Sequence, residues 1–209
     1  MSLAQWLPLA LVCLLGAMSP GPSLAVVLRH SLAGGAPAGV LCALAHGVGI
    51  FVWALLMISG LGALLVTQPA WFDALRVAGA LFLLYIGTRA LVASPEDVPS
   101  TEVSRGPIAG RRAAGEGLLI ALSNPKIAIF FAALFSQFIR PGASLSEQLL
   151  IAATAAGVDA LWYAVVAMSL SQIGARRRWQ RQTNLLNKVF GAILVAVATV
   201  VIWSVWVQR

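Results

Sequence analysis

The chain has 209 residues, of which 60% are hydrophobic and 10% are charged, and its formal net charge is +7. Soluble domains are on average about 45–50% apolar and about 25% charged, so this composition excludes an ordinary soluble protein. The basic residues lie in short gaps between long apolar runs, as in the loops of polytopic membrane proteins. The sequence has no basic patch with stacking aromatics, so a nucleic-acid partner is not expected. We therefore expect a single transmembrane domain over residues 1–209, in contact with membrane lipid.

Six apolar segments have close to the ~20 residues that a helix needs to cross a bilayer. In chain order they cover residues 3–28, 38–66, 72–92, 117–139, 147–173 and 186–207. The first segment is interrupted by SPGP at residues 19–22, and the fourth by SNPK at residues 123–126. Residues 94–116 contain several prolines and charges of both signs, which predicts a cytoplasmic loop without a helix of its own. The sequence thus predicts an all-α polytopic membrane protein.

The distribution of basic residues predicts the orientation of these segments. Ten of the 14 Lys and Arg residues fall in the loops on one side, three fall on the other side, and Lys126 lies inside a segment. The positive-inside rule places the richer set of loops in the cytoplasm and both termini at the periplasmic or extracellular face. An odd number of crossings would mix the two sets of loops, so the asymmetry favours six.

The two halves of the chain, about residues 1–93 and 117–209, match weakly and in the same order. The matching elements are Gly21-Pro22 with Asn124-Pro125, Gly49 and Trp53 with Gly157 and Trp162, and RVAGALFLL from Arg76 with KVFGAILVA from Lys188. Because each half has three helices, an odd number, the second half enters the membrane upside down relative to the first. Inverted repeats are typical of secondary transporters, which bind substrate near the midplane between the repeats.

Both interruptions carry residues that begin helices. Asn124 can cap free backbone N–H groups, and Pro125 suits a first helical position. Ser19-Pro20 or Gly21-Pro22 can do the same in the first segment. A helix N-terminus inside the membrane carries partial positive charge and favours a carboxylate. The alternative is a pair of proline kinks that only shape the packing.

The depth of these breaks depends on where the helices end. Counted from the apolar boundaries, both breaks lie in the cytoplasmic third of the membrane. Both move close to the midplane if the first helix continues to about Ala33 and the fourth begins near Ala113. The sequence leaves both depths open.

Three ionisable side chains, His46, Lys126 and Asp159, lie inside predicted membrane helices. Burying Lys or Asp at a helix centre costs ~2.5–3.5 kcal/mol on insertion scales, so each needs a partner or a function. Helices joined by a short loop are usually neighbours, which predicts a Lys126–Asp159 pair. This pair is either structural, or a site where Asp159 takes a proton or an amine and Lys126 a carboxylate. His46 is either a packing residue or a proton relay.

Aromatic side chains share helix faces with two of these groups. Trp162 and Tyr163 follow Asp159 by three and four residues, so they lie on the same helix face. Trp53 lies on one stripe with His46 for the same reason. These rings either pack between helices or flank a bound substrate.

Several stretches resemble the LysE/RhtB family of amino-acid exporters. They are SPGP in the first helix, GLLIALSNPKIAIFFAALFSQFI in the fourth, the glycine-rich second helix after GGAPAG, RVAGALFLLYIG in the third and DALWY in the fifth. The resemblance covers nearly the whole chain outside residues 94–116. It implies a six-helix protein of the bacterial inner membrane that exports amino acids and is driven by the proton gradient. The residues that it places in the family's motifs are Pro20, Gly21, Pro22, Asn124, Pro125, Lys126 and Asp159.

Two positions depart from the family pattern. The family commonly has Pro-Gln-Phe near the end of the fourth helix, where this chain has Ser136, Gln137 and Phe138. Some members carry an acid just after the position of Gly49, where this chain has Ile50. The missing negative charge favours a neutral amino acid or a derivative over lysine or arginine.

The leading hypothesis is a transporter, and not an enzyme, that exports a small zwitterion in exchange for protons and uses neither a cofactor nor a metal. The substrate-binding residues under this hypothesis are Pro20, Gly21, Pro22, Trp53, Asn124, Pro125, Lys126, Trp162 and Tyr163. Asp159 and His46 would couple transport to protons. Export of another small solute or cation, a passive pore and assembly into a homo-oligomer stay open. A membrane thiol–disulfide electron carrier is disfavoured, because Cys13 and Cys42 both lie in the first half.

Overall fold

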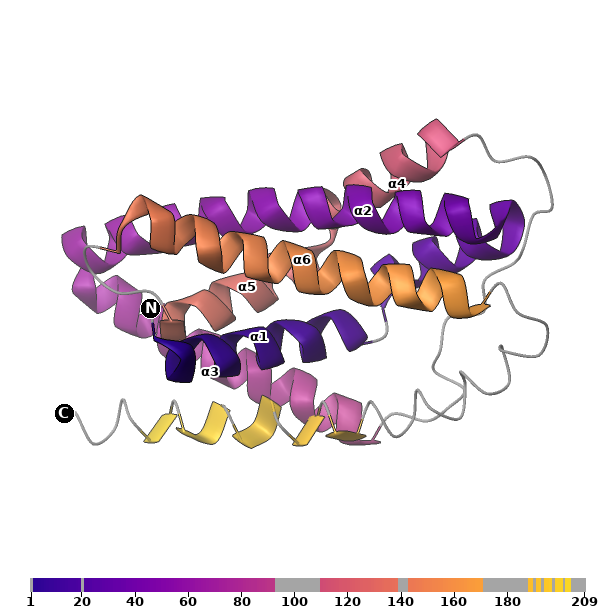
Figure 1. Cartoon of the computed structure of the whole chain (residues 1–209). Coiled ribbons are helices and arrows are strands. Elements are labelled where there is room, and N and C mark those ends of the chain that lie inside the picture. The colour runs from indigo at the N-terminus through magenta and orange to yellow at the C-terminus, as the bar shows by residue number, and fades with distance from the viewer. Residues whose placement is uncertain are drawn as a thin grey trace.

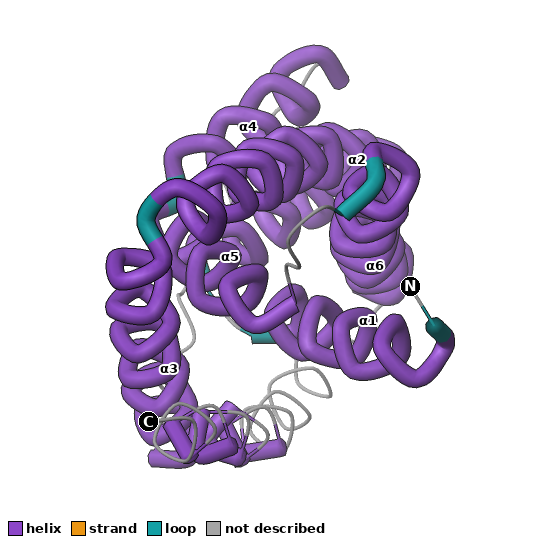
Figure 2. The backbone as a smooth tube through the Cα atoms, turned by 90° about the vertical axis from the view of Figure 1, so that its left-hand side faces the viewer, coloured by secondary structure: helices purple, strands orange, loops and turns teal. Residues whose placement is uncertain are grey.

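The computed structural model describes residues 2–19, 21–92, 110–138, 143–170 and most of 188–203, and these described residues are helical without any strand. The helices lie side by side along one common direction (Figure 1). They are α1 (Leu3–Met18), α2 (Pro22–Thr67), α3 (Pro69–Val92), α4 (Gly110–Ser123), α5 (Pro125–Phe138) and α6 (Leu145–Leu170). Further helical residues between 188 and 203 lie beside α3 (Figure 2).

α2 is two helices joined by a reversal of the chain at Gly35. This glycine has φ 74° and ψ −180°, a conformation that is essentially restricted to glycine. A side chain on Gly39 would overlap Ser31. Eight residues along a straight helix are about 12 Å apart, so this contact requires the chain to fold back on itself. The predicted boundary between the first and second membrane segments is therefore correct, and the first helix continues well past residue 28.

Both predicted interruptions are breaks between helices. α1 has 16 residues and ends at Met18, and α2 begins at Pro22 and has about the same length before Gly35. α4 and α5 have 14 residues each and meet at Asn124. Each break thus divides its helix pair into near-equal halves. The helix extents are those that the deeper of the two expected positions requires, while the depth of the breaks in a membrane stays a prediction.

Besides the end of the first segment, expected at residue 28, one further predicted boundary is wrong. Helix α4 begins at Gly110, so residues 110–116 are helical although the sequence predicted a loop over 94–116. The first turns of α4 contain the charged residues Arg112 and Glu116. These residues are four positions apart and form an ion pair on the helix surface. The low hydropathy of residues 110–116 led to the prediction of a loop, although the helix begins before the apolar stretch.

The apolar helices are those of a membrane protein. By length and composition, α6 over Leu145–Ser169 is apolar enough to cross a membrane, and so is the stretch Pro22–Leu61 of α2, which Gly35 divides. α4 and α5, bent by 56° at their break, make a third crossing if they count as one. α1 is apolar but, at 16 residues or about 24 Å, shorter than a hydrocarbon core of about 30 Å.

The position of α5 explains where the functional groups gather. Figure 2 looks along the bundle and shows α5 inside, with α1, α2 and α3 around it. Its phenylalanines fill the core, and the rings of Phe131 and Phe135 stack at 5.1 Å. α2 packs against both α4 and α6, so the whole bundle closes around the two breaks.

Candidate functional site

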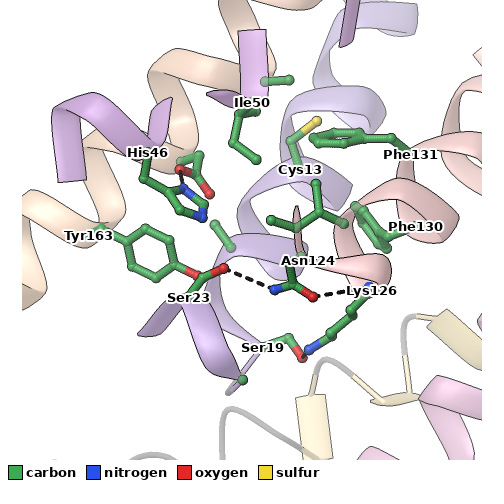
Figure 3. Close-up of a pocket in the computed structure, with 16 residues that line it drawn as sticks. Cys13, Ser19, Ser23, His46, Ile50, Asn124, Lys126, Phe130, Phe131 and Tyr163 are labelled. Carbon is green, nitrogen blue, oxygen red and sulfur yellow. Dashed lines mark hydrogen bonds and ion pairs between the residues drawn. The ribbon is translucent and has the colours of Figure 1, made fainter. Parts of the chain in front are cut away.

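The two helix breaks lie against each other. Asn124 at the second break donates from Nδ2 to Oγ of Ser23 in the first turn of α2, at 3.1 Å. Lys126 donates from Nζ to Oγ of Ser19 at the end of α1, at 2.6 Å. These two contacts join segments about 100 residues apart in the chain, and Figure 3 shows them at the lower edge of one cavity.

The two breaks are built differently. Asn124 accepts the backbone N–H of Lys126 on its Oδ1 at 3.0 Å, and its carbonyl accepts the N–H of Ile127 at 3.0 Å. The N-terminus of α5 is thus capped by its own residue. Gly21, which precedes α2, has no side chain and makes no side-chain cap. The N-terminus of α2 is therefore the one that keeps partial positive charge for a ligand.

A cavity lies between the breaks and the helices around them. Its non-atom space, counted together with the solvent at its open part, is about 560 Å³. Its polar lining comes from α1, α2, α5, α6 and the two breaks: Ser19, Gly21, Ser23, His46, Asn124, Lys126, Asp159 and Tyr163. Its apolar lining is Cys13, Gly16, Ala17, Ile50, Ile127, Phe130, Phe131 and Ala155.

Asp159 and His46 form a buried pair on the wall formed by α2 and α6. Nδ1 of His46 lies 2.6 Å from Oδ2 of Asp159, and both side chains are at most 9% exposed. With Asp159 ionised, Nδ1–H is the donor, and Nε2 becomes an acceptor. Among the described residues Nε2 has no hydrogen-bond partner. The ring of Tyr163 holds the imidazole by an edge-on contact at 5.1 Å.

The expected Lys126–Asp159 pair is corrected by these contacts. Both residues line the same cavity, but Asp159 is bonded to His46, while Lys126 is bonded to Ser19. The partners of both charged groups come from the first half of the chain, Ser19 from the end of α1 and His46 from α2, and not from the neighbouring helix of the second half. His46, which the sequence left undecided between packing and a proton relay, is thereby in direct contact with the buried acid.

The other residues expected at the site divide into three groups. Gly21, Asn124 and Tyr163 line the cavity, whereas Trp53 and Trp162 do not. Trp53 donates instead to the carbonyl oxygens of Ala121 and Leu122, the last turn of α4, at 3.1 and 3.3 Å. Pro22 and Pro125 begin helices α2 and α5 as expected. Pro20 lies outside the described residues.

The sequence did not identify several residues that line the cavity. Ser19 and Ser23 were missed as partners because a serine in an apolar helix is usually bonded to its own backbone. Their spacing of four residues across the SPGP break was the available signal. Gly16 and Phe130 carried no polar signal, and only the approach of α1 to α5 brings them together.

A second polar cluster lies away from the cavity, between α2 and α4. Glu116 is paired with Arg29, with Nε2 of His30 at 3.0 Å and with Nε of Arg112 at 2.9 Å. His30 is fully buried, and the sequence missed it because the first segment was expected to end at residue 28. The cluster joins the second half of the first broken pair to the first half of the second broken pair.

Comparison with known proteins identifies the family of this chain. The homoserine/homoserine lactone efflux protein of Salmonella typhi is 30% identical over 205 residues, which cover 94% of this chain and 95% of that protein. The threonine efflux protein of Escherichia coli strain K12 is 28% identical over 200 residues, covering 91% of this chain and 94% of that protein. No solved structure matches the chain. The sequence pattern of the LysE type translocators matches residues 14–204, and the chain therefore belongs to the LysE type translocator family.

Proposed function

We propose that the protein exports a small neutral amino acid, or a close derivative, across the bacterial inner membrane in exchange for protons. The observation that carries this proposal is the meeting of two helix breaks, one ammonium group and one buried His–Asp pair around a single cavity. The names of the relatives, efflux proteins for homoserine, homoserine lactone and threonine, support a small polar cargo. Ile50 in the lining adds no negative charge for a basic cargo.

The carboxylate of the cargo binds at the first break. The uncapped N-terminus of α2 supplies partial positive charge, and Gly21 leaves that end open towards the cavity. Lys126 extends to the same place, because a Cβ on Gly21 would lie only 3.5 Å from its Nζ. A helix N-terminus and an ammonium group together favour a carboxylate over a neutral group.

The ammonium group of the cargo binds on the opposite wall. Asp159 supplies a carboxylate, and Nε2 of His46 supplies an acceptor that has no other partner among the described residues. A carboxylate buried among apolar helices is costly to keep charged without a cation nearby. Either the ammonium group of the cargo or a proton can provide that positive charge, and competition between the two couples their movements in opposite directions.

The same arrangement supports a transport cycle between two halves. The order of helices is the same in both halves. The first half has a broken pair, α1 with the part of α2 before Gly35, followed by the rest of α2 and by α3. The second half has the broken pair α4 and α5, followed by α6 and the helical residues near 188–203. We propose six crossings as two inverted repeats, with both termini outside the cytoplasm. The cavity lies where the breaks of the two repeats meet, so rocking of one repeat against the other exposes it to each side in turn.

The test uses vesicles that contain the purified protein and an imposed proton gradient. Wild-type protein is expected to move labelled L-homoserine in the direction that the gradient drives. Asp159→Asn removes the exchangeable charge, and we expect gradient-driven movement to fall by more than about 100-fold while the variant stays folded. Tyr85→Phe is the matched control, since this exposed side chain lies outside the cavity.

The outcomes separate the alternatives. Normal gradient-driven export by Asp159→Asn would refute the coupling role of this residue. Flux in wild-type protein that ignores the gradient would show a passive pore. If no amino acid moves and another solute or a cation does, the proposed cargo is wrong.

A further inference from the structure

We propose that Phe130, seated on Gly16, sets the upper size limit for the side chain of the cargo. This inference rests on the proposed function and assigns the third contact point of the same cavity. The polar walls account for the carboxylate and the ammonium group, but neither accounts for how the cavity distinguishes one amino acid from another. The remaining wall is apolar and comes from α1 and α5.

α1 and α5 extend from the breaks side by side, with opposite chain directions. Ser19 touches Lys126 at the breaks, and one helical turn away Gly16 touches Phe130. Phe130 follows Lys126 by four residues, so it lies about 6 Å further along α5. A cargo whose carboxylate is at Lys126 therefore directs its side chain along this wall. Figure 3 shows Phe130 on the side of the cavity opposite to His46 and Tyr163.

The contact between Gly16 and Phe130 is so close that any other residue at position 16 requires the ring of Phe130 to move. A Cβ on Gly16 would lie 2.6 Å from Cζ and 2.7 Å from Cε1 of Phe130. The ring therefore lies directly over the backbone of α1. Phe131 holds its other side, with the two ring centres 5.8 Å apart in an edge-on arrangement. The position of the Phe130 ring is thus fixed by a missing side chain on one helix and an aromatic neighbour on its own helix.

Because of this arrangement, a larger residue at position 16 is expected to make the cavity smaller, and a smaller residue at position 130 is expected to make it larger. A methyl group at position 16 displaces the ring from α1 towards the cavity, because Phe131 fills the other side. Shortening Phe130 removes the ring and lengthens the cavity at the same end. A pocket distinguishes ligands that differ by a methylene group by about 10-fold or more, so the effect is measurable.

The experiment compares cargo of increasing size. Efflux of labelled L-homoserine from vesicles is measured in competition with L-alanine, L-threonine, L-leucine and L-phenylalanine. Phe130→Ala is expected to raise the apparent affinity for leucine relative to alanine by about 10-fold, and Gly16→Ala to lower it by a similar factor. In the double variant Gly16→Ala/Phe130→Ala the added methyl group meets no ring. Its apparent affinity for leucine relative to alanine is therefore expected to exceed the wild-type value.

Two further variants keep the result interpretable. Phe130→Leu makes the same change in milder form and serves if Phe130→Ala does not fold. Leu83→Ala shortens a fully buried side chain of α3, outside the cavity, so it is expected to reduce the amount of folded protein without changing the ratio. An unchanged leucine-to-alanine ratio in transport-active Phe130 variants would overturn the inference. Failure of wild-type protein to move any amino acid would overturn the proposed function instead.

Discussion

The two helix breaks look alike in the sequence but act differently in the structure. The second break is capped by a side chain, because Oδ1 of Asn124 accepts the backbone N–H of Lys126, whereas the first-turn carbonyl bonds occur at both breaks. The first break has only Gly21 before α2 and no side-chain cap. The second break then supplies its charge, Lys126, to the first through Ser19. One break therefore provides an open helix end, and the other provides rigidity and an ammonium group.

This difference shows why a matched pair of breaks need not be a symmetric site. A cargo carboxylate needs a single seat, and two uncapped helix ends at the same depth would leave one of them without a ligand. Orphan N–H groups away from water are costly, so a cap on the second break avoids that cost. The following changes test this division between the breaks, from the largest expected effect to the smallest.

Loss of the ammonium group is expected to have the largest effect. Lys126→Met keeps the length of the side chain but removes the charge, and a hydrogen bond to a charged group is worth about 1.5–3 kcal/mol. We expect the KM for L-homoserine to rise by about 10- to 100-fold, measured as initial rates in vesicles. Lys126→Arg keeps the charge and should recover part of the affinity. Equal KM values for wild-type protein and Lys126→Met would show that the cargo carboxylate does not bind there.

A side chain at position 21, the open N-terminus of α2, is expected to have the next largest effect on the KM. Gly21 has φ 177° and ψ −172°, an extended conformation that any residue adopts, so Gly21→Ala should fold normally. Its methyl group would lie 3.5 Å from Nζ of Lys126 and would narrow the carboxylate seat. We expect an increase in KM of about 10-fold with unchanged thermal stability in detergent. Loss of stability without loss of affinity would assign Gly21 a structural role.

Removal of the cap at the second break is expected to affect stability first. Asn124→Ala loses both the bond to the N–H of Lys126 and the bond to Ser23, and loss of an N-cap costs about 0.5–2 kcal/mol. Asn124→Ser keeps a capping oxygen but is too short to maintain the contact with Ser23. The difference between their melting temperatures separates the cap from the bridge between breaks. If Asn124→Ala melts like wild-type protein, the capped break is not the rigid one.

The smallest effect is expected outside both breaks. Glu116→Gln weakens the pairs with Arg29, His30 and Arg112, in a side chain that is 26% exposed. Partly exposed ion pairs contribute about 0–1 kcal/mol each, so we expect a small decrease in melting temperature and an unchanged KM. The difference from wild-type protein should shrink at high salt, since salt screens exposed charges. A large change in KM would show that this cluster takes part in transport.

The sequence predicted the fold in outline because long apolar runs and mid-run prolines are local signals. The breaks at SPGP and SNPK, the helical class and the family are all confirmed. Boundaries were less reliable where helices continue into polar residues, as at Gly110 and beyond residue 28. The number of crossings and the inverted repeat stay predictions.

Residue pairs were the part that local signals could not determine. Asp159 was identified from its burial cost, but its partner is His46 on α2, while Lys126 bonds Ser19 at the end of α1. Trp53 has the spacing of a cavity residue yet bonds the last turn of α4. A helix face predicts which side chains point the same way, but the packing of neighbouring helices decides what they meet.

The sequence by itself determined that this chain is a helical membrane protein with two broken helices and three ionisable groups inside its apolar segments. These properties follow from hydropathy, proline and the cost of burying charge, each of which acts within a short stretch of chain. Only the tertiary structure decided that the two breaks share one cavity, that His46 bonds Asp159 and that Phe130 lies over Gly16. Those contacts join residues up to 114 positions apart, and the packing of α1, α2, α5 and α6 is what brings them together.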